Sequence, residues 1–250
     1  MMRVLLTRPL EDSRALAETL EAGGEAESID PLIWPLTRIV PTRIAPSGTA
    51  LKLPPTTGGL LFTSANGVRA LAALTGRRDL PALCVGKATA QAARKAGFRD
   101  CFPADGDARA LAELARRSGI REFFHPRGRD TAGDLKGWLA ETGQRVTEAV
   151  LYQAEETGPP PAPVAAALAR GTVDLVTIWS RRASAILARH FSKPGAGTEA
   201  RLDNTGLLAI SRGAAEPLEA SGFRRILLAE APDAAAMLAK IRAYATGAGQ

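Results

Sequence analysis

The sequence has few of the residue types that bind metals or cross-link chains. It contains two cysteines, Cys84 and Cys101, and two histidines in 250 residues. The cysteines lack the paired spacing of zinc ligands, and two of them do not make a disulfide framework in a chain of this size. Two histidines also leave a metal site short of ligands. We therefore expect a cytoplasmic protein without a metal.

Long apolar runs and glycine-rich nucleotide loops are also missing. No run is long enough to span a bilayer, and the N-terminal segment has no signal-peptide core. The segment VGKATA, Val85 to Ala90, lacks the upstream glycine of a P-loop, and no dinucleotide fingerprint occurs. ATP and NAD are disfavoured, and no other cofactor and no membrane partner are expected.

The net charge of +6 raises the question of nucleic acid, because basic surfaces release counterions from phosphate backbones. Lys and Arg occur mostly singly or in short pairs such as Arg77-Arg78 and Arg181-Arg182. Neither a basic helix nor a zinc finger nor an aromatic stacking platform accompanies them. This distribution favours a local anion site on a soluble protein and argues against a nucleic-acid partner.

Two kinds of segment each occur twice along the chain. The first kind, residues 3–29 and 121–153, is a strand, a turn with Pro and Arg, a helix with Leu on one face, and another strand. The second kind has two strand-to-helix turns, and its copies begin at Gly59 and Asp174. Short apolar strands alternating with longer helices predict parallel sheets covered on both faces. The expected fold class is α/β, with two similar lobes.

The order of these segments leaves two lobe arrangements open, either sequential lobes or a chain that crosses between lobes twice. We favour two crossings, because proline-rich stretches at 31–55 and 159–163 fall where the crossings would lie. One lobe then comprises residues 1–36 and 154–250, and the other comprises residues 37–153. A two-stranded crossing of this kind predicts a hinge and a cleft between the lobes.

Small hydroxylated residues, glycines and cations gather in the turns that follow the predicted strands. Ligands of parallel sheets collect there, because helix N-termini present unpaired N–H groups and partial positive charge. Added cations suit a small molecule with several carboxylates or phosphates. The candidate binding residues are Arg8, Ser64, Asn66, Gly67, Lys87, Thr89, Arg127, Ser180, Arg182, Ser211 and Arg212.

Several candidates also have an ordinary structural explanation. Ser64, Thr89 and Ser180 suit helix N-caps, each contributing about 1 kcal/mol to its helix. The arginines suit solvated surface positions. His125 could be a general base, but a lone histidine is more often a satisfied structural residue. Six turns of the same kind in one chain nevertheless favour binding.

Five parts of the sequence resemble the uroporphyrinogen-III synthase family. They are LLTRP near the N-terminus, LLFTSANGV at Leu60 to Val68, VGKATA at Val85 to Ala90, AVLYQ at Ala149 to Gln153, and weaker repeats after Asp174. FTSANGV and VGKATA are fairly specific, and the resemblance covers nearly the whole chain in order. It implies two α/β lobes joined by a two-stranded crossing.

The resemblance also implies a reaction that needs no cofactor. Members of the family close hydroxymethylbilane, a linear tetrapyrrole rich in carboxylates, to uroporphyrinogen III with ring D inverted. Loss of the terminal hydroxyl gives an azafulvene-type cation, ring D attacks to form a spiro intermediate, and fragmentation and re-closure follow. The main task of the protein is then to hold the bilane in the spiro-forming conformation.

The same resemblance assigns roles to individual residues. The family's tyrosine, which assists departure of the hydroxyl, corresponds to Tyr152, and a phenol of pKa about 10 is protonated at neutral pH and can donate a proton. A half-buried strand aromatic is the ordinary alternative. Family hydroxyls in the turns correspond to Ser64, Thr89 and Ser180. The chain departs from the family at Ser211, where the second copy usually has a threonine turn; Arg212 can compensate there.

Two rival functions stay open at this stage. One is a non-catalytic two-lobed sensor that closes on an anionic small molecule, although no output segment is visible. The other is a sugar-phosphate enzyme, although no turn carries the paired carboxylates that acid–base work needs. We expect a monomeric enzyme of tetrapyrrole biosynthesis.

Overall fold

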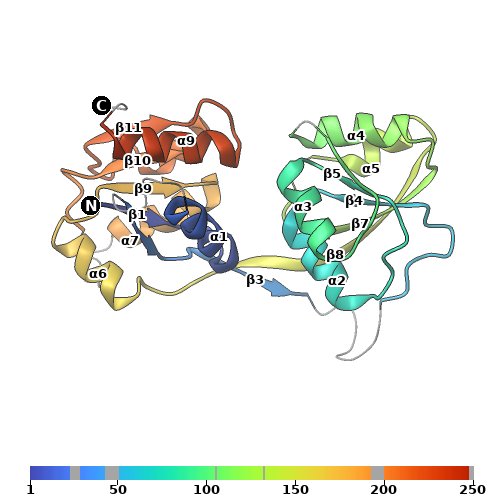
Figure 1. Cartoon of the computed structure of the whole chain (residues 1–250), viewed down its shortest axis with the longest axis horizontal. Coiled ribbons are helices and arrows are strands. Elements are labelled where there is room, and N and C mark those ends of the chain that lie inside the picture. Colours follow the sequence, from blue (N-terminus) through green and yellow to red (C-terminus); the bar gives the residue numbers. More distant parts are fainter. Residues whose placement is uncertain (23–28, 43–50, 105, 132, 193–199, 248–250) are drawn as a thin grey trace. The chain divides into compact units, whose positions relative to one another are not determined.

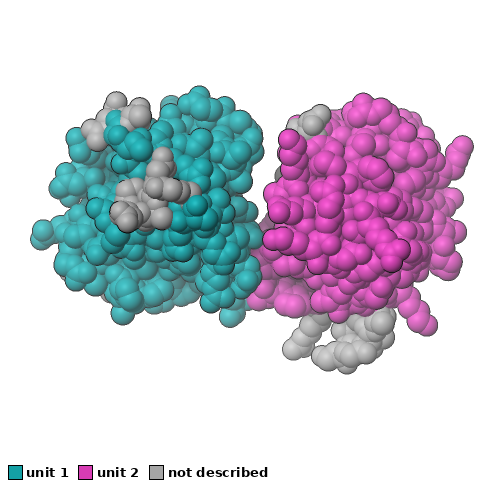
Figure 2. Space-filling view, viewed as in Figure 1, with its two compact units in different colours: residues 1–38, 155–250 teal, residues 39–154 magenta. Residues whose placement is uncertain are grey.

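The computed structural model describes residues 1–22, 29–42, 51–104, 106–131, 133–192 and 200–247. The chain divides into two compact units, which we call unit 1 and unit 2 (Figure 2). Unit 1 comprises residues 1–38 and 155–250, and unit 2 comprises residues 39–154. The chain therefore leaves unit 1 once and returns to it once.

Unit 1 is built on a parallel sheet with the strand order β11-β10-β9-β1-β2 (Figure 1). The early strands β1 and β2 lie beside the late strands, so residues far apart in the chain become neighbours, as in the pairing of Val4 with Leu175. The strands are β1 (Met2–Leu6), β2 (Ile29–Ile33), β9 (Leu175–Ile178), β10 (Gly206–Ala209) and β11 (Arg225–Leu228).

Helices cover both faces of this sheet. Alternate residues of β1 point to opposite faces, so Val4 and Leu6 pack with α1 and α9, whereas Leu5 packs with α6 and α7. This two-sided burial explains why the strands read as continuous apolar runs. The helical segments are α1 (Leu10–Glu21), α6 (Ala162–Ala169), α7 (Arg181–Ser192), α8 (Arg212–Ala215), the 3-10 turn η2 (Glu216–Leu218) and α9 (Ala234–Ala245).

The second sheet has the order β3-β8-β7-β4-β5-β6, and β4 to β8 pair in parallel. The strands are β3 (Thr37–Pro41), β4 (Gly59–Phe62), β5 (Ala82–Cys84), β6 (Cys101–Pro103), β7 (Glu122–Gly128) and β8 (Arg145–Glu156). β3 and β8 run antiparallel, since the N–H of Thr42 donates to Leu151 O at 2.9 Å and the N–H of Thr157 donates to Leu36 O at 3.1 Å. These two strands are the stretches in which the chain passes between units.

Unit 2 also has helices on both faces of its sheet. Phe62 of β4 packs with α2 and α3, and its neighbour Leu61 packs with α4 and α5. The helices are α2 (Ala65–Leu74), α3 (Lys87–Lys95), α4 (Ala108–Arg117) and α5 (Leu135–Ala140). The predicted α/β fold, with parallel sheets flanked by helices and a two-stranded connection, is confirmed. The proline run 159–163, however, lies within unit 1, where Pro161 is the N-cap of α6.

In each sheet the strand order reverses at one place, and the two neighbouring strands at that place send their helices to opposite faces. In unit 1, α1 follows β1 on one face and α7 follows β9 on the other. In unit 2, α2 follows β4 and α5 follows β7 in the same way. The carboxyl ends of such strand pairs form a crevice in which α/β proteins bind ligands. We call these places the switch points of unit 1 and unit 2.

Candidate functional site

A serine and a tyrosine meet at the switch point of unit 2. Ser64 lies just beyond β4 and is the N-cap of α2, because its Oγ accepts a hydrogen bond from the Gly67 N–H at 3.2 Å. Tyr152 lies on β8, and its hydroxyl oxygen is 2.7 Å from Ser64 Oγ. Since Ser64 Oγ already accepts from Gly67, it can donate its own hydrogen to Tyr152. The phenol proton then remains available for another acceptor.

Two glycines set the space around this pair. A register shift between Arg127 and Gly128 places Gly128 opposite Tyr152, and a Cβ at Gly128 would lie 2.9 Å from Tyr152 Cε2. A Cβ at Gly67 would lie 2.6 Å from the carbonyl oxygen of Pro126. The first turn of α2 can therefore approach β7, and the tyrosine ring can approach the backbone of β7 at Gly128, only where side chains are absent.

The environment of Tyr152 keeps its phenol protonated at neutral pH. Burial raises the pKa of Tyr152 above its ordinary value, while hydrogen bonds from Ser64 and the Gly128 backbone partly offset that rise. A protonated phenol beside a helix N-terminus can give a proton to a leaving group, and the helix dipole then favours the resulting negative charge.

A polar chain built around a buried histidine lies beside this pair. His125 of β7 is 2% exposed, with Nδ1 3.2 Å from Glu148 Oε1 and Nε2 3.3 Å from Thr63 Oγ1. The other carboxylate oxygen of Glu148 is 3.3 Å from Arg127 Nε. Desolvation lowers the pKa of His125, and the hydrogen bond to Glu148 only partly offsets it. Both ring nitrogens are engaged, so His125 fits the satisfied structural histidine and not the general base.

The switch point of unit 1 carries fixed charge and an indole ring. The Arg8 guanidinium lies 4.5 Å from the ring centroid of Trp179 and 3.0 Å from Asp12 Oδ2. Thr7, buried beside Arg8, donates from Oγ1 to the carbonyl of Thr177 at 2.6 Å. Ser180 caps α7, since its Oγ accepts from the Ala183 N–H at 3.1 Å. Arg8 and Ser180 thus belong to adjacent turns.

The remaining candidates of unit 1 are exposed. Ser211 follows β10 and caps α8, accepting from the Ala214 N–H at 3.4 Å. Arg212 begins α8, and its Nε lies 3.9 Å from Glu219 Oε1. Arg182 lies in the first turn of α7. All three stand beyond strand carboxyl ends, as ligand-binding residues of parallel sheets do.

The other candidates of unit 2 differ in accessibility. Lys87 is the exposed first residue of α3, and Asn66 accepts a hydrogen bond from Arg69 in the first turn of α2. Thr89 is 6% exposed and lies on the buried side of α3, whose N-cap is Gly86. The expectation that Thr89 could be an N-cap is therefore wrong, because the helix begins two residues before it.

The structure thus brings Ser64, Gly67 and Tyr152 into contact, and places Arg127 beside them through its bond to the Gly128 carbonyl at 3.1 Å. Sequence reasoning missed Trp179 and Glu148. Trp179 could have been noticed as an indole directly before a candidate serine. Glu148 gave no signal, because its meeting with His125 depends on strand register. The cleft between the lobes stays a prediction.

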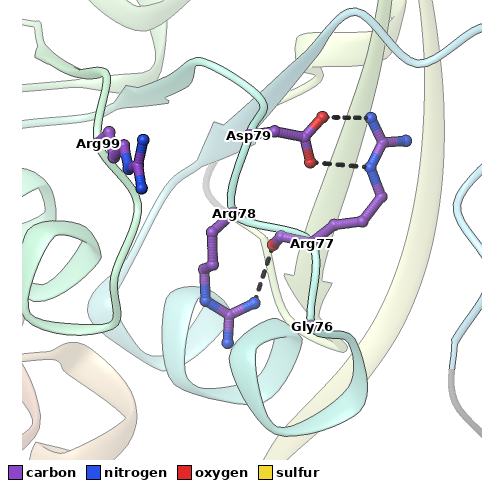
Figure 3. Close-up of a pocket in the computed structure, with 5 residues that line it drawn as sticks. All are labelled: Gly76, Arg77, Arg78, Asp79 and Arg99. Carbon is purple, nitrogen blue, oxygen red and sulfur yellow. Dashed lines mark hydrogen bonds and ion pairs between the residues drawn. The ribbon is translucent and has the colours of Figure 1, made fainter.

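A pocket of about 480 Å³ lies at the opposite end of the unit 2 sheet, before β5 and β6 (Figure 3). Arg77 pairs with Asp79 at 2.8 Å. Arg78 donates to carbonyls at the C-terminal ends of α2 and α3, including Ala96 O at 2.7 Å. The chain itself satisfies these two cations, so the candidate site is placed at the switch points. The lining residues are Gly76, Arg77, Arg78, Asp79 and Arg99.

The fold is that of an α/β protein of two units, each with a switch point of the kind at which α/β proteins bind ligands. A sequence model of the family described as "Uroporphyrinogen-III synthase HemD" matches residues 15–239. The chain therefore belongs to the uroporphyrinogen-III synthase family, which confirms the resemblance seen in the sequence. It is an enzyme that acts on a small-molecule tetrapyrrole. No curated protein matches the chain.

Solved structures of uroporphyrinogen-III synthases resemble the chain over nearly its whole length. The Helicobacter pylori synthetase is 16% identical, with 97% of this chain and 99% of that chain covered and a TM-score of 0.61, and it shares the fold. The wild-type Thermus thermophilus enzyme is 22% identical over 99% of both chains, with a TM-score of 0.41. Within the described residues, none of the helices could cross a membrane.

Proposed function

We propose that the reaction of this family, closure of hydroxymethylbilane to uroporphyrinogen III with ring D inverted, is carried out at the Ser64–Tyr152 pair. The observation that carries the proposal is the 2.7 Å contact between the two hydroxyls at the N-terminus of α2. A phenol held in this way can donate a proton outward while its oxygen accepts from serine.

The proton of Tyr152 goes to the departing hydroxyl of the bilane. The carbon–oxygen bond breaks, the oxygen keeps the electron pair and leaves as water, and the pyrrole nitrogen stabilises the remaining cation. The Ser64 hydroxyl and the positive end of α2 stabilise the phenolate that remains. The ring carbon that is attacked later loses a proton, which restores the phenol. The chemistry is a dehydration and rearrangement without net oxidation.

We propose that the cations of the strand-end turns bind the carboxylates of the substrate. Arg8 follows β1, and Lys87, Arg182 and Arg212 lie in the first turns of helices, where backbone N–H groups add to their charge; Arg127 lies at the carboxyl end of β7. The capping residues Ser180 and Ser211 lie in the same turns. Shared positioning of this kind holds a flexible bilane in one conformation.

We also propose a cytoplasmic monomer that acts on a free substrate, without nucleic-acid or membrane partners. Cys84 and Cys101 are both free and buried, and burial raises the pKa of Cys84 to about 12. Protonated, unpaired thiols suit a reducing compartment.

Incubation of the protein with freshly prepared hydroxymethylbilane tests the function directly. We expect uroporphyrinogen III to form faster than the uninverted isomer I, which arises without catalysis. Chromatographic separation of the two isomers measures the ratio. A product that is only isomer I, at the uncatalysed rate, would contradict the assignment.

A further inference from the structure

A line of hydrogen-bonded side chains connects the turn after β4 with β7 and β8, next to the Ser64–Tyr152 pair. It runs from Thr63 through His125 to Glu148, with distances of 3.3 Å and 3.2 Å. The proposed reaction uses none of these three groups. A buried imidazole such as that of His125 is costly unless it is paired, so its place in this line needs a physical reason.

The chemistry of the three groups fixes the direction of their hydrogen bonds. The Glu148 carboxylate forms an ion pair with Arg127 Nε at 3.3 Å, which favours its charged form, so it accepts the hydrogen bond from His125. His125 then carries its proton on Nδ1, and the lone pair of Nε2 accepts from the Thr63 hydroxyl. Desolvation opposes protonation of His125, and the nearby Arg127 cation acts in the same direction.

Both ends of this line are attached to the proposed reacting pair. Thr63 is bonded covalently to Ser64, and Glu148 lies on β8, the strand that also carries Tyr152. His125 stands opposite Glu148 in the register of β7 and β8, while β7 also pairs with β4 (Figure 1). A shift of Thr63 relative to Glu148 would therefore change the separation of the serine and tyrosine hydroxyls.

We propose that His125 is a positioning residue, which ties Thr63 to Glu148 and so holds the hydroxyls of Ser64 and Tyr152 within hydrogen-bond distance. The inference rests on the proposed role of that pair in the reaction. His125 does not reach the substrate itself, because it is 2% exposed and both ring nitrogens are engaged.

The tautomer of His125 can be tested without any activity measurement. The chain has only two histidines, so the signal lost in His125→Gln identifies His125 in a ¹⁵N spectrum of the imidazoles. We expect a protonated Nδ1 and an unprotonated Nε2 at pH 7. An imidazolium, or a proton on Nε2, would overturn the inference even if the enzyme is active as proposed.

The positioning role is tested at Thr63, where matched variants are available. Thr63→Val removes the hydroxyl at nearly constant shape and should lower kcat about tenfold with little change in KM. Thr63→Ser keeps the hydroxyl and should restore kcat. Equal kcat in wild type and Thr63→Val would overturn the inference, as would equal losses in both variants.

A double variant separates positioning from general destabilisation. If Thr63 acts through the Ser64–Tyr152 pair, Thr63→Val should slow Tyr152→Phe no further, because the pair is already broken. A full additional tenfold loss in the double variant would overturn the inference. If the wild type makes no uroporphyrinogen III, the proposed function is wrong. The tautomer of His125 then still tests the hydrogen bonds from His125 to Thr63 and Glu148 on which this inference depends.

Discussion

The switch points of unit 1 and unit 2 have the same topology but different side chains. Unit 1 presents Arg8 over Trp179, with Asp12 as its ion-pair partner. Unit 2 presents Ser64 and Tyr152 at 2.7 Å. A guanidinium stays charged at all accessible pH values, whereas a phenol can give up a proton and take it back. We propose from this comparison that the switch point of unit 1 serves binding alone, whereas that of unit 2 also moves a proton, although the same kind of fold supports both.

Removal of the phenol hydroxyl should have the largest effect. Tyr152→Phe takes away the proposed proton donor but keeps the ring that lies on Gly128, so folding should be preserved. We expect kcat to fall about 100-fold, in the range of general acid catalysis, with KM nearly constant. Steady-state kinetics measure kcat and KM, and circular dichroism checks that the variant is folded.

Tyr244→Phe is the matched control, because Tyr244, in α9 of unit 1, is the other tyrosine of the chain. Its hydroxyl makes a long hydrogen bond of 3.4 Å to the Asp174 carbonyl. This variant should keep full activity. Full activity in Tyr152→Phe would remove the tyrosine from the mechanism and break the contrast between the units.

A smaller loss is expected at the serine. Ser64→Ala removes both the donor to Tyr152 and the cap that accepts from Gly67 N–H. We expect about a tenfold lower kcat and about 1 kcal/mol lower stability from the lost cap. Ser180→Ala removes the equivalent cap in unit 1, so it should match the stability loss without the kcat loss. An equal fall of kcat in both variants would contradict the division of roles.

A change at the fixed charge of unit 1 should appear in KM. Arg8→Gln removes a cation that lies over Trp179, and we expect KM to rise about fivefold with kcat within about twofold of wild type. Arg14→Gln in the following helix, α1, is the control, because Arg14 pairs with Glu11 on the exposed surface at 3.4 Å. If Arg8→Gln lowers kcat as much as Ser64→Ala does, unit 1 takes part in more than binding.

The parts of this fold that follow from local pattern could be predicted from the sequence. Apolar runs such as Leu60 to Phe62 are buried on both faces of a sheet, which predicts parallel strands between helices. The serine and tyrosine could be singled out one by one, and their roles remain predictions. Their contact could not be predicted, because it depends on the order β8-β7-β4 in the sheet.

Contacts that depend on the register of paired strands could not be predicted from the sequence either. Arg8 and Trp179 meet because β1 pairs with β9, across most of the chain. His125 meets Glu148 because β7 and β8 stay in register up to Arg127, where the pairing shifts. Thr89 was expected as a possible N-cap of α3. The N-cap is instead Gly86, which has no side chain to mark the start of the helix in the sequence.

The smallest effect expected is a pH dependence of stability that belongs to unit 2. Burial lowers the pKa of His125 in the folded chain, whereas an unfolded histidine titrates near pH 6.5. The unfolded chain therefore binds the proton first as the pH falls. The stabilisation is complete above about pH 6.5 and is lost progressively below it, by at most about 1.4 kcal/mol per pH unit.

Urea unfolding between about pH 7.5 and about pH 5.5 measures this slope, with His125→Gln as the variant that lacks the titrating group. The groups that face His125 are Glu148, Arg127 and Thr63, and all three remain in that variant. His190→Gln controls for the loss of an imidazole in unit 1. We expect the slope to flatten in His125→Gln alone. If wild type and His125→Gln lose stability equally on acidification, the buried imidazole is not held neutral and the contrast between the two switch points loses its electrostatic basis.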